Sequence, residues 1–211
     1  MSHQQYLQAF TTMLEMQDRM NQRVHPEWPA QNFEWYRAVW IECAELMDHQ
    51  GYKWWKKQHA DIEQVQMEVV DIWHFGMSAL IRPGVAAAEI AQEMIDELDG
   101  NPAVVESNVL LATEALAADA LSRKSFSVVV FRDLLHAVGL DFTSLYRQYV
   151  GKNVLNFFRQ DHGYKDGSYI KIWQGREDNV HLVEVLASLD PSAQDYADAV
   201  YRGLKARYPA A

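Results

Sequence analysis

Two acidic pairs constrain the fold of this chain most, because each lies inside an apolar helical pattern. Glu42 and Glu45 are three residues apart, and so are Glu68 and Asp71. On an α-helix this spacing places both carboxylates of a pair on one face, one turn apart. Carboxylates on a core-facing stripe are costly unless a cation or hydrogen bonds compensate them. The sequence therefore predicts helices that gather these four carboxylates around a cation, and a solvated acidic face is the competing interpretation.

The ligand type restricts which cation such a site would hold. Oxygen ligands favour Mg²⁺, Mn²⁺ or Ca²⁺ over zinc, and Mg²⁺ commonly bridges carboxylates to substrate phosphates. A di-iron bundle would need E-x-x-H pairs, and the central stretch has only one D-x-x-H, Asp71 to His74. For His74 a packed or hydrogen-bonded side chain is the simpler interpretation. A basic aromatic insert at 53–57, KWWKK, separates the two acidic pairs. Carboxylates next to such an insert suggest a phosphorylated ligand.

Helical periodicity runs through nearly the whole chain and predicts an all-α fold. Gly51 is expected to end one helix, Asp61 and Asp141 to cap the starts of two others, and Pro191 to open the last. Residues 161–179 are expected to form a polar loop without a hairpin. The predicted helices span residues 3–22, 33–49, 62–81, 85–98, 103–121, 126–138, 142–160, 180–188 and 192–207.

Composition excludes several classes of protein. The formal net charge of −10 argues against binding a nucleic-acid polymer. A single cysteine, Cys43, excludes an internal disulfide framework and a multi-cysteine zinc site. Neither a membrane-spanning apolar run nor a signal-peptide pattern is present, so we expect a cytoplasmic protein without a membrane partner.

A second polar constellation lies in the C-terminal third of the chain. Lys152, Asn156 and Arg159 follow one another at i, i+4 and i+7, which places all three on one helical face. A face of cations and an amide that leads into a flexible loop suits a polyphosphate, although a basic surface patch would look the same. No P-loop motif is present. The loop adds four further aromatic or basic residues: Tyr164, Lys165, Tyr169 and Lys171.

Together these stretches resemble the dimeric, all-α dUTPases, within the all-α NTP pyrophosphatases. The signature of that superfamily is E-x-x-E, a spacer and E-x-x-D. The flanking text makes the resemblance specific: ECAELMD, YKWWKK, EVVDIWHF, GKNVLNFFRQDHGYKDGSYIKIW and the EDN that follows it. MLEMQDRMN near the N-terminus matches as well. The resemblance covers about residues 10–180, while residues 85–140 and the segment after 180 carry no matched motif.

The resemblance implies a multi-helix bundle with a four-helix catalytic core, assembled as a homodimer. We expect one domain over 1–211, with residues 181–211 as a C-terminal helical extension. The implied reaction is hydrolysis of dUTP, and also of dUDP, with Mg²⁺ or Mn²⁺. The products from dUTP would be dUMP and pyrophosphate, and water would attack the β-phosphorus.

The resemblance also implies a role for each matched residue. The metal ligands would be Glu42, Glu45, Glu68 and Asp71. Glu42 or Glu45 would in addition orient or deprotonate the attacking water. The nucleoside pocket would consist of Gln17, Asn21, Phe75 and Asn156, with Phe75 on the uracil ring and Trp54 beside the deoxyribose. The phosphates would be held by Lys56, Lys152, Arg159, Tyr164, Lys165 and Lys171.

Two alternatives remain open at this stage. The first is a pyrophosphatase of the same superfamily for another nucleotide, such as dCTP, which would differ in pocket residues around Asn156 and Gln17. The second is a helical interaction protein without catalytic activity, whose acids only solvate a bundle.

Overall fold

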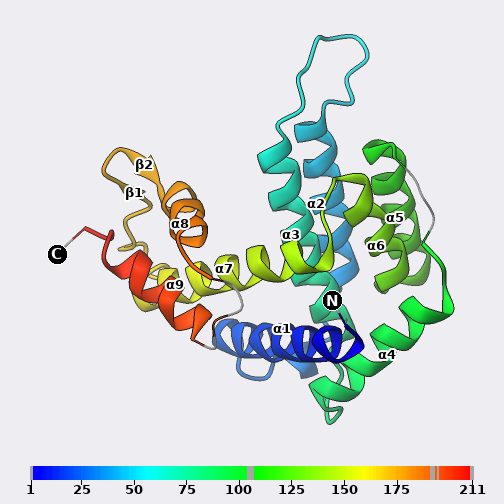
Figure 1. Ribbon diagram of the computed structural model, residues 1–211, viewed down its shortest axis with the longest axis horizontal. Coiled ribbons are helices and arrows are strands. Elements are labelled where there is room, and N and C mark those ends of the chain that lie inside the picture. The colour runs from blue at the N-terminus through cyan, green and yellow to red at the C-terminus, as the bar shows by residue number, and fades with distance from the viewer. Residues whose placement is uncertain (1, 104–106, 191–192, 194, 210–211) are drawn as a thin grey trace. The chain divides into compact units, whose positions relative to one another are not determined.

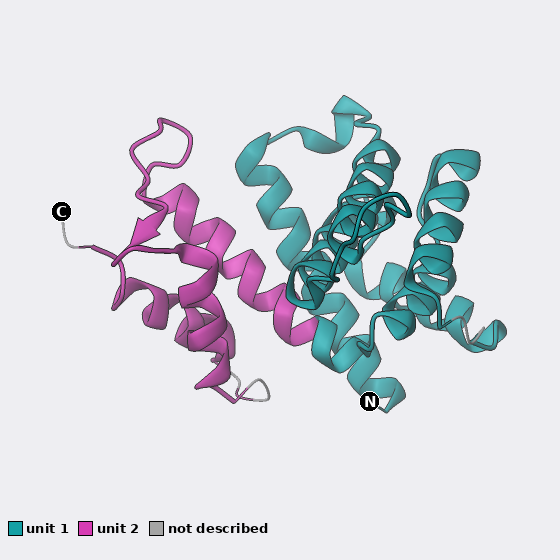
Figure 2. Cartoon of the chain, turned by 90° about the horizontal axis from the view of Figure 1, so that it is seen from above, with its two compact units in different colours: residues 1–145 teal, residues 146–211 magenta. Residues whose placement is uncertain are grey.

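The computed structural model describes residues 2–103, 107–190, 193 and 195–209, and it is built almost entirely of helices (Figure 1). The all-α prediction is confirmed. The chain divides into two compact units, residues 1–145 and 146–211 (Figure 2). The single domain stays a prediction. The elements are α1 (His3–Val24), η1 (Trp28–Gln31), α2 (Trp35–Gln50), α3 (Ile62–Leu80), α4 (Ala87–Gly100), α5 (Val109–Arg123), α6 (Val128–Ala137), α7 (Phe142–Asp161), β1 (Ile172–Trp173), β2 (Arg176–Glu177), α8 (Asp178–Ala187) and α9 (Tyr196–Lys205).

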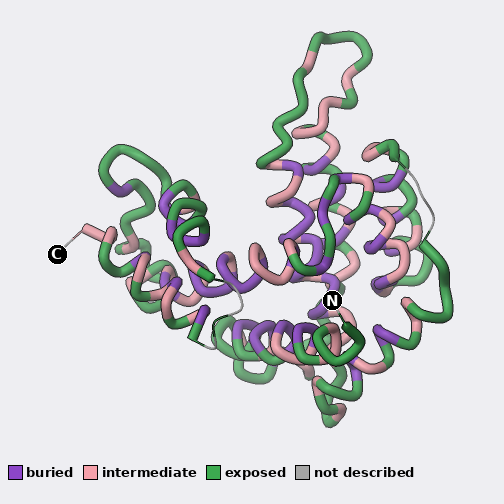
Figure 3. The backbone as a smooth tube through the Cα atoms, viewed as in Figure 1, coloured by how far each residue is buried: buried purple, intermediate pink, exposed green. Residues whose placement is uncertain are grey.

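Helices α2 and α3 carry the acidic pairs, and local sequence defines where they end and begin. Gly51 ends α2 with a φ of 86°, a left-handed conformation that glycine adopts without strain. The carboxylate of Asp61 accepts a hydrogen bond from the backbone N–H of Gln64 and caps α3. Between them, residues 51–61 form a mostly exposed connection that extends beyond both helices (Figure 3). Both predicted caps are confirmed.

The core of unit 1 is built around Trp73 of α3, which is fully buried. Its ring stacks on Phe131 of α6 at 4.8 Å between centroids, and Phe10 of α1 approaches at 5.9 Å. One turn away, a Cβ on Gly76 would lie 2.6 Å from the ring of Phe126. The missing side chain at Gly76 is therefore what lets α3 pack against that ring. Because Trp73 lies between Glu68 and Phe75 on α3, this core fixes the helix that carries half of the acidic site.

Unit 2 has a separate aromatic core around Trp173, which is also fully buried. The indole stacks on His181 of α8 at 5.2 Å and packs against Phe158 of α7 at 5.7 Å. Its Nε1 atom donates a hydrogen bond to the carbonyl of Ile170 at 2.7 Å. These contacts attach the 161–177 segment to helices α7 and α8.

Three sequence predictions need correction. Strands β1 and β2 form a two-stranded antiparallel hairpin inside the predicted loop, because Gln174 and Gly175 both have positive φ and make a two-residue turn. Helix α5 begins at Val109 rather than 103, where Asn108 accepts from two backbone N–H groups. Helix α9 begins at Tyr196 rather than 192. Pro191, expected to open it, lies outside the described residues. The helix predicted over 126–138 is confirmed as α6.

No helix within the described part of the chain is long and apolar enough to cross a membrane.

Candidate active site

An acidic cluster forms where α2 packs on α3 in unit 1. Glu42, Glu45 and Glu68 each offer a carboxylate oxygen, and these atoms lie within 4.8 Å of one another. Glu42 and Glu45 come from successive turns of α2, and Glu68 comes from α3. Asp71, one turn beyond Glu68, is close enough to act electrostatically on Glu42. The two motifs therefore converge as the sequence predicts.

The pKa values of these carboxyl groups reflect how strongly burial and mutual repulsion oppose their negative charges. Burial, followed by repulsion from Asp71 and Glu45, raises the pKa of Glu42 to about 8. Burial and the charge of Asp71 also raise the pKa of Glu68, and a hydrogen bond from Glu42 opposes that rise. The cluster therefore holds a proton on Glu42 that a carboxyl group in water would lose.

The donors at this site fit a hard divalent cation. The clustered groups are carboxylates, and the held proton is one that a bound cation would displace. Cys43 adjoins Glu42 in sequence, but its side chain is buried in the core, where burial raises the pKa of the thiol to about 12, and the clustered ligand atoms are all carboxylate oxygens. His49 Nε2 lies 3.5 Å from Glu68 Oε1, at the edge of the cluster.

A closed ring of polar side chains joins α1 to α3 in the same unit. Gln17 Nε2 donates to Oδ1 of Asn21 at 2.9 Å, and Asn21 Nδ2 donates to Oγ of Ser78 at 3.0 Å. Ser78 Oγ donates to the carbonyl of His74 at 2.9 Å, and His74 Nδ1 lies 2.8 Å from Gln17 Oε1. All four side chains are buried. The structure thus brings Gln17 and Asn21 together, and the hydrogen-bonded reading of His74 is confirmed.

The aromatic residues predicted for the nucleoside occupy two environments. Phe75 is half-buried on α3, and its ring stacks on Trp35 at 6.2 Å between centroids. Trp54 lies in the connection between α2 and α3, is 90% exposed and touches Trp55 edge-on. Lys56 in the same connection is exposed as well. An aromatic ring left this open to water is available to a ligand or a partner.

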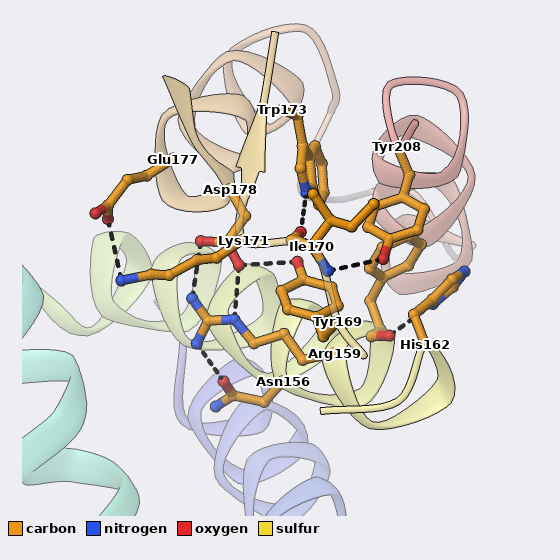
Figure 4. A network of polar contacts seen from close by, with 11 residues as sticks. Asn156, Arg159, His162, Tyr169, Ile170, Lys171, Trp173, Glu177, Asp178 and Tyr208 are labelled. Atoms are coloured by element: carbon orange, nitrogen blue, oxygen red, sulfur yellow. Dashed lines mark hydrogen bonds and ion pairs between the residues drawn. The ribbon is translucent and has the colours of Figure 1, made fainter. Parts of the chain in front are cut away.

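In unit 2, Arg159 is held by a buried acid (Figure 4). Its Nε and Nη2 atoms donate to the two carboxylate oxygens of Asp178, at 2.8 and 2.9 Å. The hydroxyl of Tyr169 donates to the same carboxylate at 2.8 Å. Arg159 Nη1 also donates to Oδ1 of Asn156 at 3.3 Å. The structure therefore brings together Asn156 and Arg159, joins Tyr169 of the loop to them, and adds Asp178 as the shared acceptor.

The charges in this network stabilise each other. Burial alone would raise the pKa of Asp178, but hydrogen bonds from Arg159 and Tyr169 outweigh it and the net shift is downward. Burial would lower the pKa of Arg159, and the Asp178 carboxylate reverses that effect. Burial and the bond to Asp178 raise the pKa of the Tyr169 phenol. All three groups therefore stay in their ordinary charge states, with Asp178 ionised.

The remaining cationic and phenolic residues predicted to hold phosphates lie in unit 2. Lys171 forms an exposed ion pair with Glu177 at 3.3 Å, and Tyr164 is exposed with its ring 6.0 Å from Tyr169. Lys165 is exposed, and Lys152 is half-buried on α7. Lys56 of the predicted phosphate group belongs to unit 1. The predicted carboxylates thus lie in unit 1, and the predicted phosphate-binding residues lie mainly in unit 2.

The sequence analysis missed Asp178 and Ser78, and it placed Tyr169 in the basic loop without predicting its bond to Asp178. Asp178 belongs to the EDN text that contributed to the resemblance, and Tyr169 to the preceding motif. That text is the only signal that pointed to them. Ser78 had none, because a serine near the end of an apolar helix is unremarkable by pattern.

The chain is all-α, and acidic residues of its E-x-x-E and E-x-x-D motifs meet where two adjacent helices pack, as expected for a metal-dependent hydrolase of nucleotides. The dUTPase family model matches residues 9–164, about three quarters of the chain. The protein therefore belongs to the all-α dUTPase family, and it is a dUTP diphosphatase, a hydrolase. No curated protein matches its sequence.

Proposed function

We propose that the protein hydrolyses dUTP to dUMP and pyrophosphate, also accepts dUDP, and depends on Mg²⁺, with Mn²⁺ as a substitute. The observation that carries the proposal is the cluster of Glu42, Glu45 and Glu68, in which a bound cation would offset the cost of burial and mutual repulsion. Asp71 would complete the ligand set. When bound, the cation supplies positive charge that offsets the phosphates and lowers the pKa of a coordinated water.

The carboxylates of α2 would act on the water. Glu42 is the residue we assign as the base or orienting group, with Glu45 as its neighbour on the same helical face. The water oxygen bonds to the β-phosphorus, its proton passes to the Glu42 carboxylate, and the bond from that phosphorus to the oxygen bridging to the α-phosphorus breaks. dUMP then leaves with the bridging oxygen. Hydrolysis in ¹⁸O-labelled water tests this directly, since the label should enter pyrophosphate and be absent from dUMP.

We assign the binding of the nucleoside and of the phosphates of dUTP to the residues that the resemblance implies. Gln17, Asn21 and Asn156 supply amides that can pair with the uracil edge, and Phe75 supplies a ring for stacking. Trp54 would lie beside the deoxyribose. Six residues would hold phosphates and stabilise charge developing on them: Lys56, Lys152, Arg159, Tyr164, Lys165 and Lys171.

A nucleotide panel with a matched variant tests the reaction. Pyrophosphate release from dUTP should exceed release from dCTP, dTTP and UTP, and a chelator should stop it. Glu42→Gln should abolish turnover while the far-UV circular dichroism is unchanged. Glu89→Gln, an exposed acid on α4, is the control and should keep full activity. Near-normal turnover in Glu42→Gln would remove that residue from catalysis.

We also infer a homodimer, as the resemblance implies, and a cytoplasmic protein that binds no nucleic-acid polymer, as the composition and the net charge of −10 predict. Exposure of Trp55 supports an interface, because aromatic residues are enriched where proteins meet. Sedimentation equilibrium measures the mass directly. A monomer at enzymatically active concentrations would contradict the dimer.

A further inference from the structure

The ion pair between Arg159 and Asp178 fixes the orientation of the Arg159 guanidinium. Two parallel hydrogen bonds hold the guanidinium in a fork, and the Asp178 side chain has no exposed surface. The acceptor comes from the first residue of α8, 19 positions along the chain, while the arginine lies in the last turn of α7. Tyr169 adds a third bond to the same carboxylate. The guanidinium plane is therefore set from outside its own helix (Figure 4).

This fixed guanidinium determines which way the Asn156 amide faces. A guanidinium has five N–H donors and no acceptor, so the group that faces it must be the amide oxygen. Arg159 Nη1 lies 3.3 Å from that oxygen. A flipped amide would place NH₂ against N–H, lose the bond and bring two donors together. The NH₂ group of Asn156 is thus directed away from Arg159 and is held as a donor.

We propose that Asp178 is a positioning residue for base selection: through Arg159 it fixes Asn156 with its NH₂ group toward the base. A donor held there pairs with a carbonyl oxygen at position 4 of a pyrimidine, as uracil has. It opposes an amino group at the same position, as cytosine has. The inference rests on the proposed function, because it takes Asn156 as part of the nucleoside pocket. It makes no distinction between uracil and thymine, which share the 4-oxygen.

Discrimination between the two bases is the readout that separates positioning from a purely structural role. A site built around a fixed donor rejects a base that offers another donor, because one of the two would stay unpaired. Loosening the site without changing its hydrogen-bond pattern would weaken both ligands equally. The ratio of their affinities therefore reports the orientation of Asn156, and overall affinity does not.

The experiment uses the full chain with Mg²⁺ and two non-hydrolysable analogues, α,β-imido-dUTP and α,β-imido-dCTP, titrated by calorimetry. Asp178→Asn keeps the size of the side chain but ends the paired acceptors for Arg159. We expect the preference for the uracil analogue to narrow by about tenfold. Glu184→Gln is the matched control, since Glu184 is likewise paired with arginine in this unit, with Arg176 and Arg207, but at the surface. It should leave the preference unchanged.

A second variant keeps the test decisive if Asp178→Asn fails to fold. Asn156→Asp presents only acceptors and should move the preference toward the cytosine analogue by about tenfold or more. The proposal is overturned if Asp178→Asn weakens both analogues by the same factor, or if Asn156→Asp keeps the original preference. A wild-type chain that binds neither analogue overturns this inference together with the proposed function. Binding of the uracil analogue without pyrophosphate release from dUTP overturns the reaction alone.

Discussion

Nδ1 of His74 lies 2.8 Å from Oε1 of Gln17, and this contact closes a ring whose hydrogen bonds all run in one direction. Ser78 donates to a backbone carbonyl, which can only accept, so its oxygen must accept from the NH₂ of Asn21. The oxygen of Asn21 then faces Gln17, and the remaining oxygen of Gln17 faces His74. His74 therefore carries its proton on Nδ1, and both amides have one orientation.

Ser78→Ala should lower the free energy of unfolding by more than the loss of an ordinary serine hydrogen bond does. The variant leaves the buried Asn21 amide without its acceptor, which costs about 1–3 kcal/mol in the free energy of unfolding. It should also raise the KM for dUTP, because the amide orientation is no longer fixed. Urea unfolding and steady-state kinetics measure the two effects.

Ser188→Ala serves as the control for that variant. Ser188 likewise donates to a backbone carbonyl, of Val185 at 2.7 Å, but no amide depends on it. Equal losses of stability in the two variants would show that the ring adds nothing to the single bond.

The metal-free protein should lose stability as pH rises from about 5 to about 8. Burial and repulsion from Asp71 raise the pKa of Glu42 from 4.5 to about 8, so the folded state holds a proton that the unfolded state releases. A group of this kind stabilises the fold below its unfolded pKa, and the contribution disappears as pH passes the folded value. Thermal unfolding in a chelator at several pH values measures the fall. Mg²⁺ should restore stability most at the alkaline end.

Glu42→Gln tests the source of this pH dependence. The variant removes the titrating group while keeping its shape, so the fall in melting temperature should be much smaller. An unchanged slope would place the responsible group elsewhere.

Gly76→Ala should destabilise unit 1 by about 1–3 kcal/mol, because a new Cβ would lie 2.6 Å from the Phe126 ring. Urea unfolding followed by tryptophan fluorescence suits the measurement, since Trp73 packs against that ring at 6.0 Å. Gly100→Ala is the control, as no neighbouring atom lies within 4 Å of its added Cβ. A loss at Gly100 equal to that at Gly76 would contradict the packing argument.

Trp54→Ala should raise the KM for dUTP without changing the stability of the fold. Its side chain is 90% exposed, so the melting temperature should hardly change. If the ring lies beside the deoxyribose as proposed, the KM for dUTP should rise severalfold. Leu111→Ala, which removes an exposed apolar side chain on α5, should change neither quantity. An unaltered KM in Trp54→Ala would exclude the ring from the substrate site.

Most helices could be predicted from the sequence because the residues that begin and end them act locally. The elements that were predicted wrongly depend on specific turns and caps. Gly51 and Asp61 act within one turn of their own helix, so their signals are readable without the rest of the fold. The hairpin at 172–177 was missed because a Gln-Gly turn carries a weaker signal than Asn-Gly or Asp-Gly. The start of α9 was placed four residues early, because Pro191 looked like a first-turn residue.

By itself, the sequence determined the all-α fold, the two acidic pairs and the family, because helical spacing and motif text are local properties of the chain. Only the tertiary structure decided which partners those residues meet. The packing of α2 on α3 brings Glu42 close to Glu68, and the folded hairpin brings Asp178 onto Arg159. Burial and charge then act over these through-space distances and shift the pKa of Glu42 and of Asp178 in opposite directions. No spacing along the chain encodes which residue will supply the compensating charge.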